Sequence, residues 1–309
     1  MPVQSFVRPA KFVCLIVCVA AATLSYGIQA GRGPHARAAA RVSIVSWQPA
    51  QLVNGSPCLF QVRPGVELKS LTGTWMGHTV FFDLDPSRTT WLGFAGIGVE
   101  TEAGTYTLAL EGVTAQGTPF NAKETVRVAK AAYPSIALHV PGQFTAPDPE
   151  TVARIEQERD FKSKVFETRT PERMWSGNFT APVTTQTTDG FGTQRKFNGV
   201  VKSIHQGLDF HALTGTPVAA ANSGKVLVAR SLFYEGNCVV VDHGQGLLSL
   251  YMHLSELKVH EGDRVTRGQV VGLSGGTGRA TAPHLHMGVR WQGVYVDPAA
   301  LLRLKLPGA

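Results

Sequence analysis

The sequence predicts an all-β protein in which two regions of short strands are separated by a connector with one helix. Short runs of alternating or β-branched residues recur through most of the chain, and turn-forming residues separate them. The 309 residues include 33 glycines and 18 prolines, which favours many turns over long helices. Because the length exceeds that of one average domain, we expect two domains with targeting and connecting segments.

The first thirty residues predict an export signal. Arg8 and Lys11 precede an uncharged apolar stretch over residues 12–24. We expect residues 1–30 to be a signal peptide or an N-terminal anchor, and residues 31–40 to be a linker. The apolar stretch is shorter than the ~20 residues that cross a bilayer, which favours a cleaved signal over membrane anchorage. The protein would then be secreted across the inner membrane and act in the periplasm or cell envelope.

Cysteine usage adds one open question. Cys14 and Cys18 lie inside the expected signal, so the mature protein would keep Cys58 and Cys238. These two fall in different expected domains, and a disulfide between them is possible in an oxidising compartment.

Residues 41–131 are expected to form a small immunoglobulin-like β-sandwich. Alternating segments are separated there by turn residues at intervals typical of sandwiches. The expected strands cover residues 42–45, 59–62, 79–82, 105–110 and 124–128.

The connector over residues 132–180 begins with a proline-rich stretch and continues with a mixture of charged and apolar residues. We expect a helix at about residues 150–168, with Asp148 as its N-cap and Pro149 at the first helical position. A second β domain over residues 181–309 follows, and its short strands are bounded by Gly, Asn or Asp.

The charge balance does not identify a partner. A formal net charge of +7 would favour any polyanion. The chain has no run of interleaved basic and aromatic residues and no helix-turn-helix or RNA-binding signature, so we expect no nucleic-acid partner.

The histidines indicate where the chemistry lies, since seven of the ten follow residue 200. His205 and Asp209 are four residues apart, so on an extended strand their side chains would share a face and could bind one ion. In the run His284-Leu285-His286, alternation would place both histidines on one side and Leu285 in the opposite layer.

This pattern fits a catalytic zinc site, which takes three nitrogen or oxygen ligands and leaves one position for water. His205, Asp209 and one histidine of the pair would satisfy the count. The remaining histidine would serve in proton transfer, and His253 is a further candidate at the end of another expected strand. Three other histidines adjoin turns or polar segments and have no partner pattern: His211, His243 and His260.

A series of short motifs lies between residues 191 and 301. They are FGTQR at 191–195, HQGLDF at 205–210, GTPV at 215–218, YMHL at 251–254, VHEGDRVTRG at 259–268, TGRAT at 277–281, PHLH at 283–286 and VDP at 296–298. In order and approximate spacing, this part of the chain resembles the lysostaphin/LytM-type zinc endopeptidases, family 23 of the metallopeptidases. The resemblance covers about a third of the chain.

The resemblance implies a role for each of five residues. His205, Asp209 and His286 would hold one Zn²⁺, while His253 and His284 would be catalytic. We expect His284 to be the general base and His253 to assist it and stabilise the oxyanion, although the two roles can be exchanged. The implied fold is a LytM-like β domain of two antiparallel sheets that frame a groove with zinc at its floor.

The resemblance also implies a function. A zinc-activated water would hydrolyse peptide cross-links or stem peptides of bacterial peptidoglycan, which makes the protein a metalloendopeptidase. Ala282 and Met287 depart from the family pattern and bear on peptide preference. Which bond is cut and the oligomeric state stay open.

Two alternatives compete with this interpretation. Some proteins of the LytM type have lost metal ligands and activate other wall hydrolases, but all five candidate residues are present here. Residues 259–269 also resemble a turn of biotinyl and lipoyl carrier domains, but the lysine signature for cofactor attachment is missing.

Overall fold

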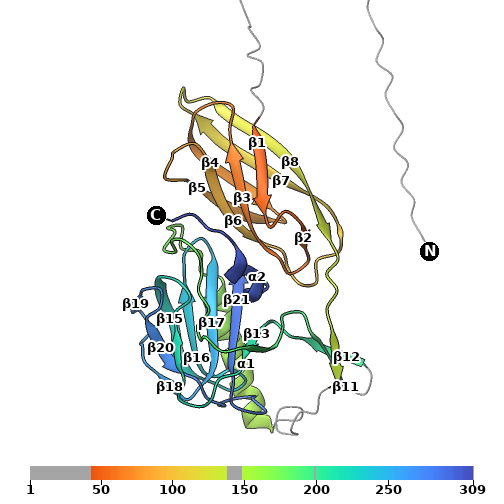
Figure 1. Cartoon of the computed structure of the whole chain (residues 1–309), viewed down its shortest axis with the longest axis vertical. Helices are drawn as coiled ribbons and strands as arrows, with labels where there is room; N and C mark the ends of the chain where they lie inside the picture. The colour runs from red at the N-terminus through yellow and green to blue at the C-terminus, as the bar shows by residue number, and fades with distance from the viewer. Residues whose placement is uncertain (1–42, 138–147, 198–199, 309) are drawn as a thin grey trace, which may run out of the picture. The chain divides into compact units, whose positions relative to one another are not determined.

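The computed structural model describes residues 43–137, 148–197 and 200–308. Strands are the predominant secondary structure in these residues, with two helices (Figure 1). The expected all-β fold class is confirmed at this level. The expected signal or anchor at residues 1–30 and the linker at 31–40 lie outside the described residues. Within the described part, neither helix has the length and apolar character of a membrane span.

The N-terminal strands pair in one continuous path, in the order β1-β3-β6-β5-β4-β7-β8-β2. Neighbours along the path are antiparallel, except that β8 and β2 are parallel. The expected segments correspond to β1, β3, β5, β7 and β8. The strands are β1 Ile44–Gln48, β2 Leu52–Val53, β3 Pro57–Arg63, β4 Leu68–Trp75, β5 His78–Leu84, β6 Trp91–Gly96, β7 Gly104–Thr114 and β8 Pro119–Ala129.

Strand β6 shows why part of this sheet was missed from the sequence. All of its residues are buried, so it lacks the alternation of polar and apolar residues that marks a half-exposed strand. Gly93 within it is required by packing, because a Cβ there would lie 2.7 Å from atoms of both Phe82 and Val80. Close packing of this kind depends on residues distant in sequence and leaves no local pattern.

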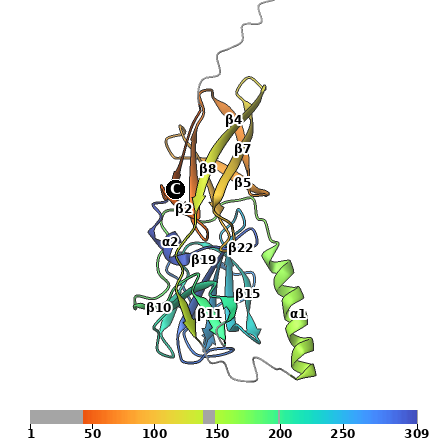
Figure 2. The same cartoon turned by 90° about the vertical axis from the view of Figure 1, so that its right-hand side faces the viewer.

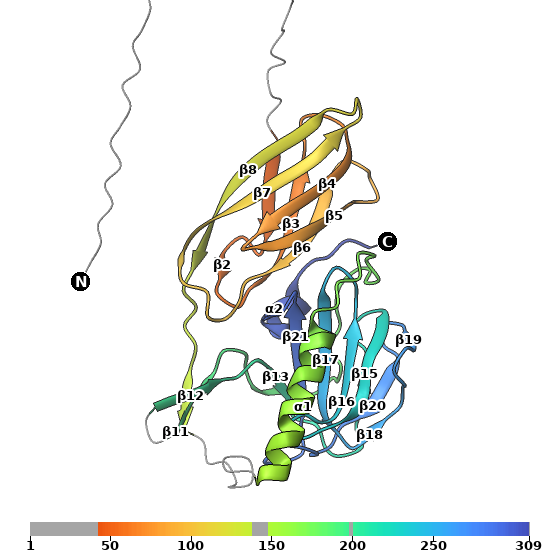
Figure 3. The ribbon, with the colours of Figure 1, turned by 180° about the vertical axis from the view of Figure 1, so that it is seen from behind.

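Helix α1 (Pro149–Phe166) confirms the helix expected at about residues 150–168. The Asp148 side chain accepts a hydrogen bond from the backbone N–H of Thr151 at 2.8 Å, which satisfies one of the free donors of the first turn. The apolar helix residues Phe161, Val165 and Phe166 pack against one face of a sheet formed by later strands. Figures 2 and 3 show the helix lying along this sheet.

The C-terminal region contains a large and a small sheet, both antiparallel. The large sheet has the order β10-β13-β21-β17-β16-β15-β19, with β22 paired to β21, and the small one has the order β14-β20-β18. A short helix, α2 (Pro298–Arg303), follows the last strand and was not predicted. The strands are β10 Thr187–Asp189, β13 Gly207–Phe210, β14 Pro217–Ala219, β15 Gly224–Leu232, β16 Gly236–Asp242, β17 Leu247–Leu254, β18 Glu256–Leu257, β19 Arg264–Val265, β20 Val270–Leu273, β21 Leu285–Trp291 and β22 Val294–Tyr295.

A third sheet, in the order β12-β11-β9, departs from the expected pair of antiparallel sheets. Strand β9 (Ser135–Ala137) belongs to the expected connector, and it pairs in parallel with β11 (Gln194–Phe197). Strand β12 (Val200–Ile204) pairs with β11 on its other side. Parallel pairing joins segments that are far apart in the chain, so no local turn signal announces it.

The described residues, from 43 to 308, belong to one compact unit. Side chains of the N-terminal strands contact the end of the large C-terminal sheet: the His78 and Trp291 rings lie 5.3 Å apart, edge to face. Gln245 also donates a side-chain hydrogen bond to the Asp83 carboxylate. The domain boundaries expected at residues 131 and 181 therefore stay predictions.

Cys58 and Cys238 are free, buried thiols, so the disulfide considered above is absent. Cys58 lies in β3 and Cys238 in β16, and they belong to different apolar clusters. Burial raises the pKa of both thiols, which makes them poor nucleophiles.

His243 is a core residue, in agreement with the absence of a partner pattern around it. Its Nδ1–H donates to the carbonyl oxygen of Ser223 at 2.8 Å, and its Nε2 lies 2.8 Å from Ser249 Oγ. Burial lowers the pKa of His243 to about 4. The other two histidines that lacked a pattern, His211 and His260, are exposed.

The buried His243 makes stability depend on pH. Below a pH of about 6.5 the unfolded chain binds a proton that folded His243 rejects, so stability falls as pH drops toward about 4. The contribution at stake is roughly 3 kcal/mol. We expect His243→Gln to show a shallower loss of stability between pH 6.5 and 4 than wild type, measured by urea unfolding at each pH. An equally steep loss of the free energy of unfolding between pH 6.5 and 4 in the two proteins would contradict this.

Candidate metal centre

Two of the expected metal ligands face each other across neighbouring strands. In the β13–β21 pair, Asp209 lies opposite His286. Leu208 and Met287, the adjacent pair, are buried in the main core, so alternation places Asp209 and His286 on the opposite face of the sheet. Directly opposed side chains in an antiparallel pair are close enough to bind one ion.

His205 reaches the same point by another route. It lies in the short segment between β12 and β13, so the expectation that strand alternation places it beside Asp209 was wrong. The segment after β10 holds it instead. The backbone of His205 pairs with Gly192 and Thr193, and its Nδ1–H donates to the carbonyl oxygen of Gly190 at 2.8 Å.

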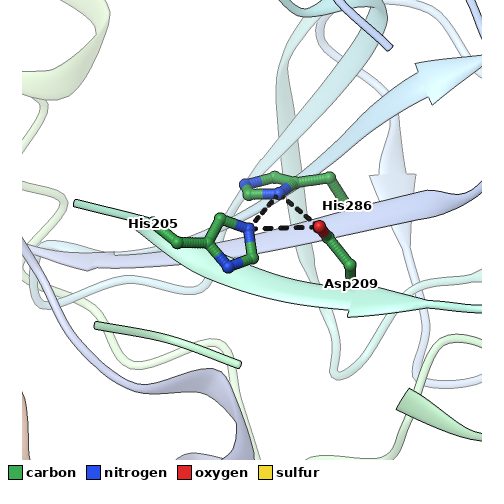
Figure 4. Close-up of side chains that lie close together, drawn as sticks. All are labelled: His205, Asp209 and His286. Atoms are coloured by element: carbon green, nitrogen blue, oxygen red, sulfur yellow. Dashed lines mark hydrogen bonds and ion pairs between the residues drawn. The ribbon is translucent and has the colours of Figure 1, made fainter. Parts of the chain in front are cut away.

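Figure 4 shows the three side chains converging. His205 Nε2 lies 3.2 Å from Asp209 Oδ1 and 3.1 Å from His286 Nδ1, and the last two atoms lie 2.7 Å apart. Ligands of a tetrahedral zinc ion with bonds of ~2.0–2.1 Å lie about 3.3 Å from each other. The three ligand atoms thus form a triangle of nearly the size that such an ion requires.

The donor chemistry also fits a cation. Because His205 Nδ1–H is used on Gly190, the neutral ring presents only a lone pair at Nε2. Asp209 Oδ1 also presents lone pairs, so two acceptors face each other at 3.2 Å. A divalent cation bound by nitrogen and oxygen ligands removes this repulsion.

Charge and burial favour an ionised Asp209 carboxylate and a neutral His286 imidazole. Burial raises the pKa of Asp209, but the imidazoles of His205 and His286 beside the carboxylate outweigh burial and hold the pKa well below its usual value. Burial lowers the pKa of His286, against the opposing effect of Asp209. An ionised carboxylate and a neutral imidazole are the forms that bind metal.

Gly207 leaves room for the His286 ring. A Cβ at Gly207 would lie 2.4 Å from both Cε1 and Nε2 of His286, so only glycine permits the ring to lie over β13. Its cross-strand partner Gly288 is different, because a Cβ there would meet its nearest neighbours at ordinary contact distances of 3.5 Å and more.

His253 lies beside this triangle at a β-bulge in β17. The pairing of β17 with β16 shifts between Tyr251 and Leu254, so two residues of β17 oppose one of β16. The backbone of His253 is left-handed, with φ +63°. Bulges of this kind redirect a side chain, and they are common next to active sites. The redirected ring lies 6.1 Å from that of His286.

The His253 ring has a fixed tautomer. Its Nδ1–H donates to the carbonyl oxygen of Thr277 at 2.8 Å, which leaves Nε2 as an acceptor. Burial lowers the pKa of His253 to about 3, and charge on His286 and His284 contributes. His253 is therefore a neutral hydrogen-bond acceptor at physiological pH.

His284 completes the group. Its ring lies 4.8 Å from that of His253, and its Nδ1–H donates to the carbonyl oxygen of Ala282 at 2.8 Å. Its Nε2 lies 3.9 Å from Asp209 Oδ1. Leu285 is fully buried, so the expected alternation through this run is confirmed. The structure thus brings all five candidate residues together, and their roles stay predictions.

Two further charged residues, Asp189 and Arg195, contact the site, and no role was expected for either from the sequence. Asp189 Oδ2 lies 3.3 Å from His205 Nδ1, and Arg195 Nη2 lies 3.2 Å from the same oxygen. Arg195 Nη2 is also 3.9 Å from Asp209 Oδ2, the oxygen that is not part of the triangle. Arg195 stood in one of the recognised motifs, whereas no sequence signal marked Asp189.

Known proteins are similar in sequence to the part of the chain that carries this site. Residues 203–298 match the profile described as Peptidase family M23. Peptidoglycan DD-endopeptidase ShyA of Vibrio cholerae is 46% identical over 94 residues, which are 30% of this chain and 22% of that protein. DD-carboxypeptidase/endopeptidase Mpg of Neisseria meningitidis is 40% identical over 98 residues, 32% of this chain and 23% of that protein. The match thus spans about a quarter or less of these curated relatives.

A solved structure extends the similarity beyond the site. The crystal structure of a protein from Pseudomonas aeruginosa assigned to peptidase M23 is 30% identical, with a TM-score of 0.63. The alignment covers 82% of this chain and 95% of that one. Together with the profile match around the triangle of His205, Asp209 and His286, this similarity shows that the chain belongs to peptidase family M23.

Proposed function

We propose that the protein is a zinc-dependent metalloendopeptidase that hydrolyses peptide cross-links or stem peptides of bacterial peptidoglycan. The observation that carries this proposal is the triangle of His205, Asp209 and His286 beside two further imidazoles. Relatives named as peptidoglycan endopeptidases support the substrate class. The retention of all five side chains favours an enzyme over a non-catalytic activator of other wall hydrolases.

In this proposal His205 Nε2, Asp209 Oδ1 and His286 Nδ1 hold one zinc ion. A bound zinc ion supplies Lewis acidity and lowers the pKa of water to about 7. Asp189 and Arg195 fix the orientation of two ligands: Asp189 lies at the outer nitrogen of His205, and Arg195 faces the second oxygen of Asp209. Such outer contacts keep ligands in their binding geometry.

His284 is assigned as the general base, because its Nε2 is unprotonated in the neutral ring and its side chain is partly accessible. After taking a proton from the attacking water, His284 can deliver it to the leaving amine. His253 accepts a hydrogen bond through Nε2 and orients the water. The oxyanion-stabilising role expected for His253 would need a proton on Nε2, which this tautomer lacks.

The remaining organisation follows the sequence. We propose that residues 1–30 direct export to the periplasm or envelope as a signal peptide or anchor. We also propose that residues 41–131 are an immunoglobulin-like sandwich, which the mainly antiparallel pairing of the N-terminal strands supports.

The proposed function is tested on purified peptidoglycan. The full protein loaded with zinc should release soluble muropeptides, and mass spectrometry of the products should show cleaved amide bonds with intact glycan linkages. His205→Ala serves as the control. Failure to release any product, together with stimulation of a second wall hydrolase, would favour the non-catalytic activator.

The ligand and catalytic assignments predict different losses. His205→Ala or Asp209→Ala should lose both bound zinc, measured by metal analysis, and activity. His284→Ala or His253→Ala should keep zinc, while kcat falls by roughly 10²–10⁴-fold. Full metal occupancy in a ligand variant, or near-normal turnover in a histidine variant, would contradict the respective assignment.

Gly207 and Gly288 provide a matched pair. Gly207→Ala displaces the His286 ring, so zinc affinity should fall by roughly 10- to 100-fold. Gly288→Ala, one position across the same strand pair, should bind zinc like wild type. Competition with a chromophoric chelator measures the zinc affinity of both variants. Equal affinities would show that zinc binding does not depend on the position of the His286 ring over β13.

A further inference from the structure

We propose that helix α1 is a positioning element of the active site, which acts through the turn Phe233–Glu235 on His253. The helix lies outside residues 203–298, the part of the chain that matches the family profile. The inference rests on the proposed function, because it assigns His253 a part in catalysis.

The first link joins the helix to the turn. Residues Phe233, Tyr234 and Glu235 connect β15 to β16. Glu158 of α1 accepts a hydrogen bond from the backbone N–H of Phe233 at 2.7 Å. Lys162, one helical turn later, pairs with the Glu235 carboxylate at 2.5 Å, and these two side chains are only 21% and 15% exposed. An ion pair shielded in this way is screened less than one on the open surface.

The second link joins the turn to the backbone of His253. The carbonyl oxygen of Glu235 accepts a hydrogen bond from the His253 N–H at 2.8 Å. His253 has the left-handed backbone of the bulge, a conformation that residues with a Cβ rarely adopt without support. Glu235 thus contacts Lys162 through its side chain and His253 through its backbone carbonyl. This single residue therefore links helix α1 to the left-handed backbone of His253.

The third link joins the turn to the ring of His253. The carbonyl oxygen of Tyr234 accepts from the N–H of Arg279 at 2.9 Å, and the N–H of Asn237 donates to Thr277 Oγ1 at 2.9 Å. At Gly236 a Cβ would lie 2.3 Å from Thr277 Oγ1, so the two segments touch. Thr277 is the residue whose carbonyl fixes the His253 tautomer. A shift of the turn would thus move both the backbone and the ring partner of His253.

These polar contacts are separable from the packing of the helix. The apolar side chains Phe161, Val165 and Phe166 cover the sheet, whereas Glu158 and Lys162 make the contacts to the turn. If α1 were only a cover, loss of the Lys162 charge would lower stability without changing turnover by the folded protein.

The test uses Lys162→Met in the full zinc-loaded protein, with Lys164→Met as the control. Lys164 is exposed on the same helix. We expect Lys162→Met to lower kcat by about 10-fold with KM and zinc content unchanged, because a small displacement of a catalytic group slows the reaction more than it weakens binding. Hydrogen exchange should become faster at the amides of His253 and the turn. Lys164→Met should match wild type in every measurement.

A charge exchange tests the pair itself. Glu235→Lys should reproduce the loss of turnover, and the double variant Lys162→Glu/Glu235→Lys should restore both kcat and slow exchange at His253. Unchanged kcat and exchange in Lys162→Met, or no recovery in the double variant, would overturn the proposal. If wild type itself cleaves no peptidoglycan, the proposed function fails, and exchange at His253 still decides whether α1 fixes this residue.

Discussion

The site depends on holding three lone-pair atoms within about 3 Å of each other, on His205, Asp209 and His286. Such atoms repel in the absence of a cation, so the scaffold must supply the rigidity that keeps them together. The cross-strand pair of Asp209 and His286 supplies most of it, because neighbouring strands fix the separation of opposed side chains. Gly207 contributes by leaving space for one ring.

Hydrogen bonds to the backbone determine which nitrogen of each imidazole faces the site. Carbonyl oxygens of Gly190, Thr277 and Ala282 each accept from an Nδ1–H, so three imidazoles present Nε2 as an acceptor. His286 instead directs Nδ1 at the triangle. Backbone carbonyls can only accept, and for this reason the tautomers follow from the fold. The result is a cluster of imidazoles and one carboxylate that suits both metal binding and proton transfer.

Part of the support for the site comes from residues before 203–298, the segment that matches the family profile. Asp189, Arg195 and helix α1 all precede residue 203, and each contacts a residue of the triangle or a segment that holds His253. Residues 203–298 thus provide the three side chains of the triangle, while preceding elements limit how these side chains can move.

The mainly β fold, helix α1 with its Asp148 cap, and the five residues that meet at the site could be predicted from the sequence, because these features depend on local period, capping chemistry and recognisable motifs. How the five residues meet depends on contacts between distant parts of the chain. His205 reaches the triangle from the short segment between β12 and β13 and not from a strand face, and His253 is redirected by a bulge whose register is set against β16. The parallel β9–β11 pair, the uniformly buried β6 and the free state of Cys58 and Cys238 likewise depend on partners distant in the chain. A pattern along one strand specifies which face is buried, but it carries no information about which strand lies opposite or in what register.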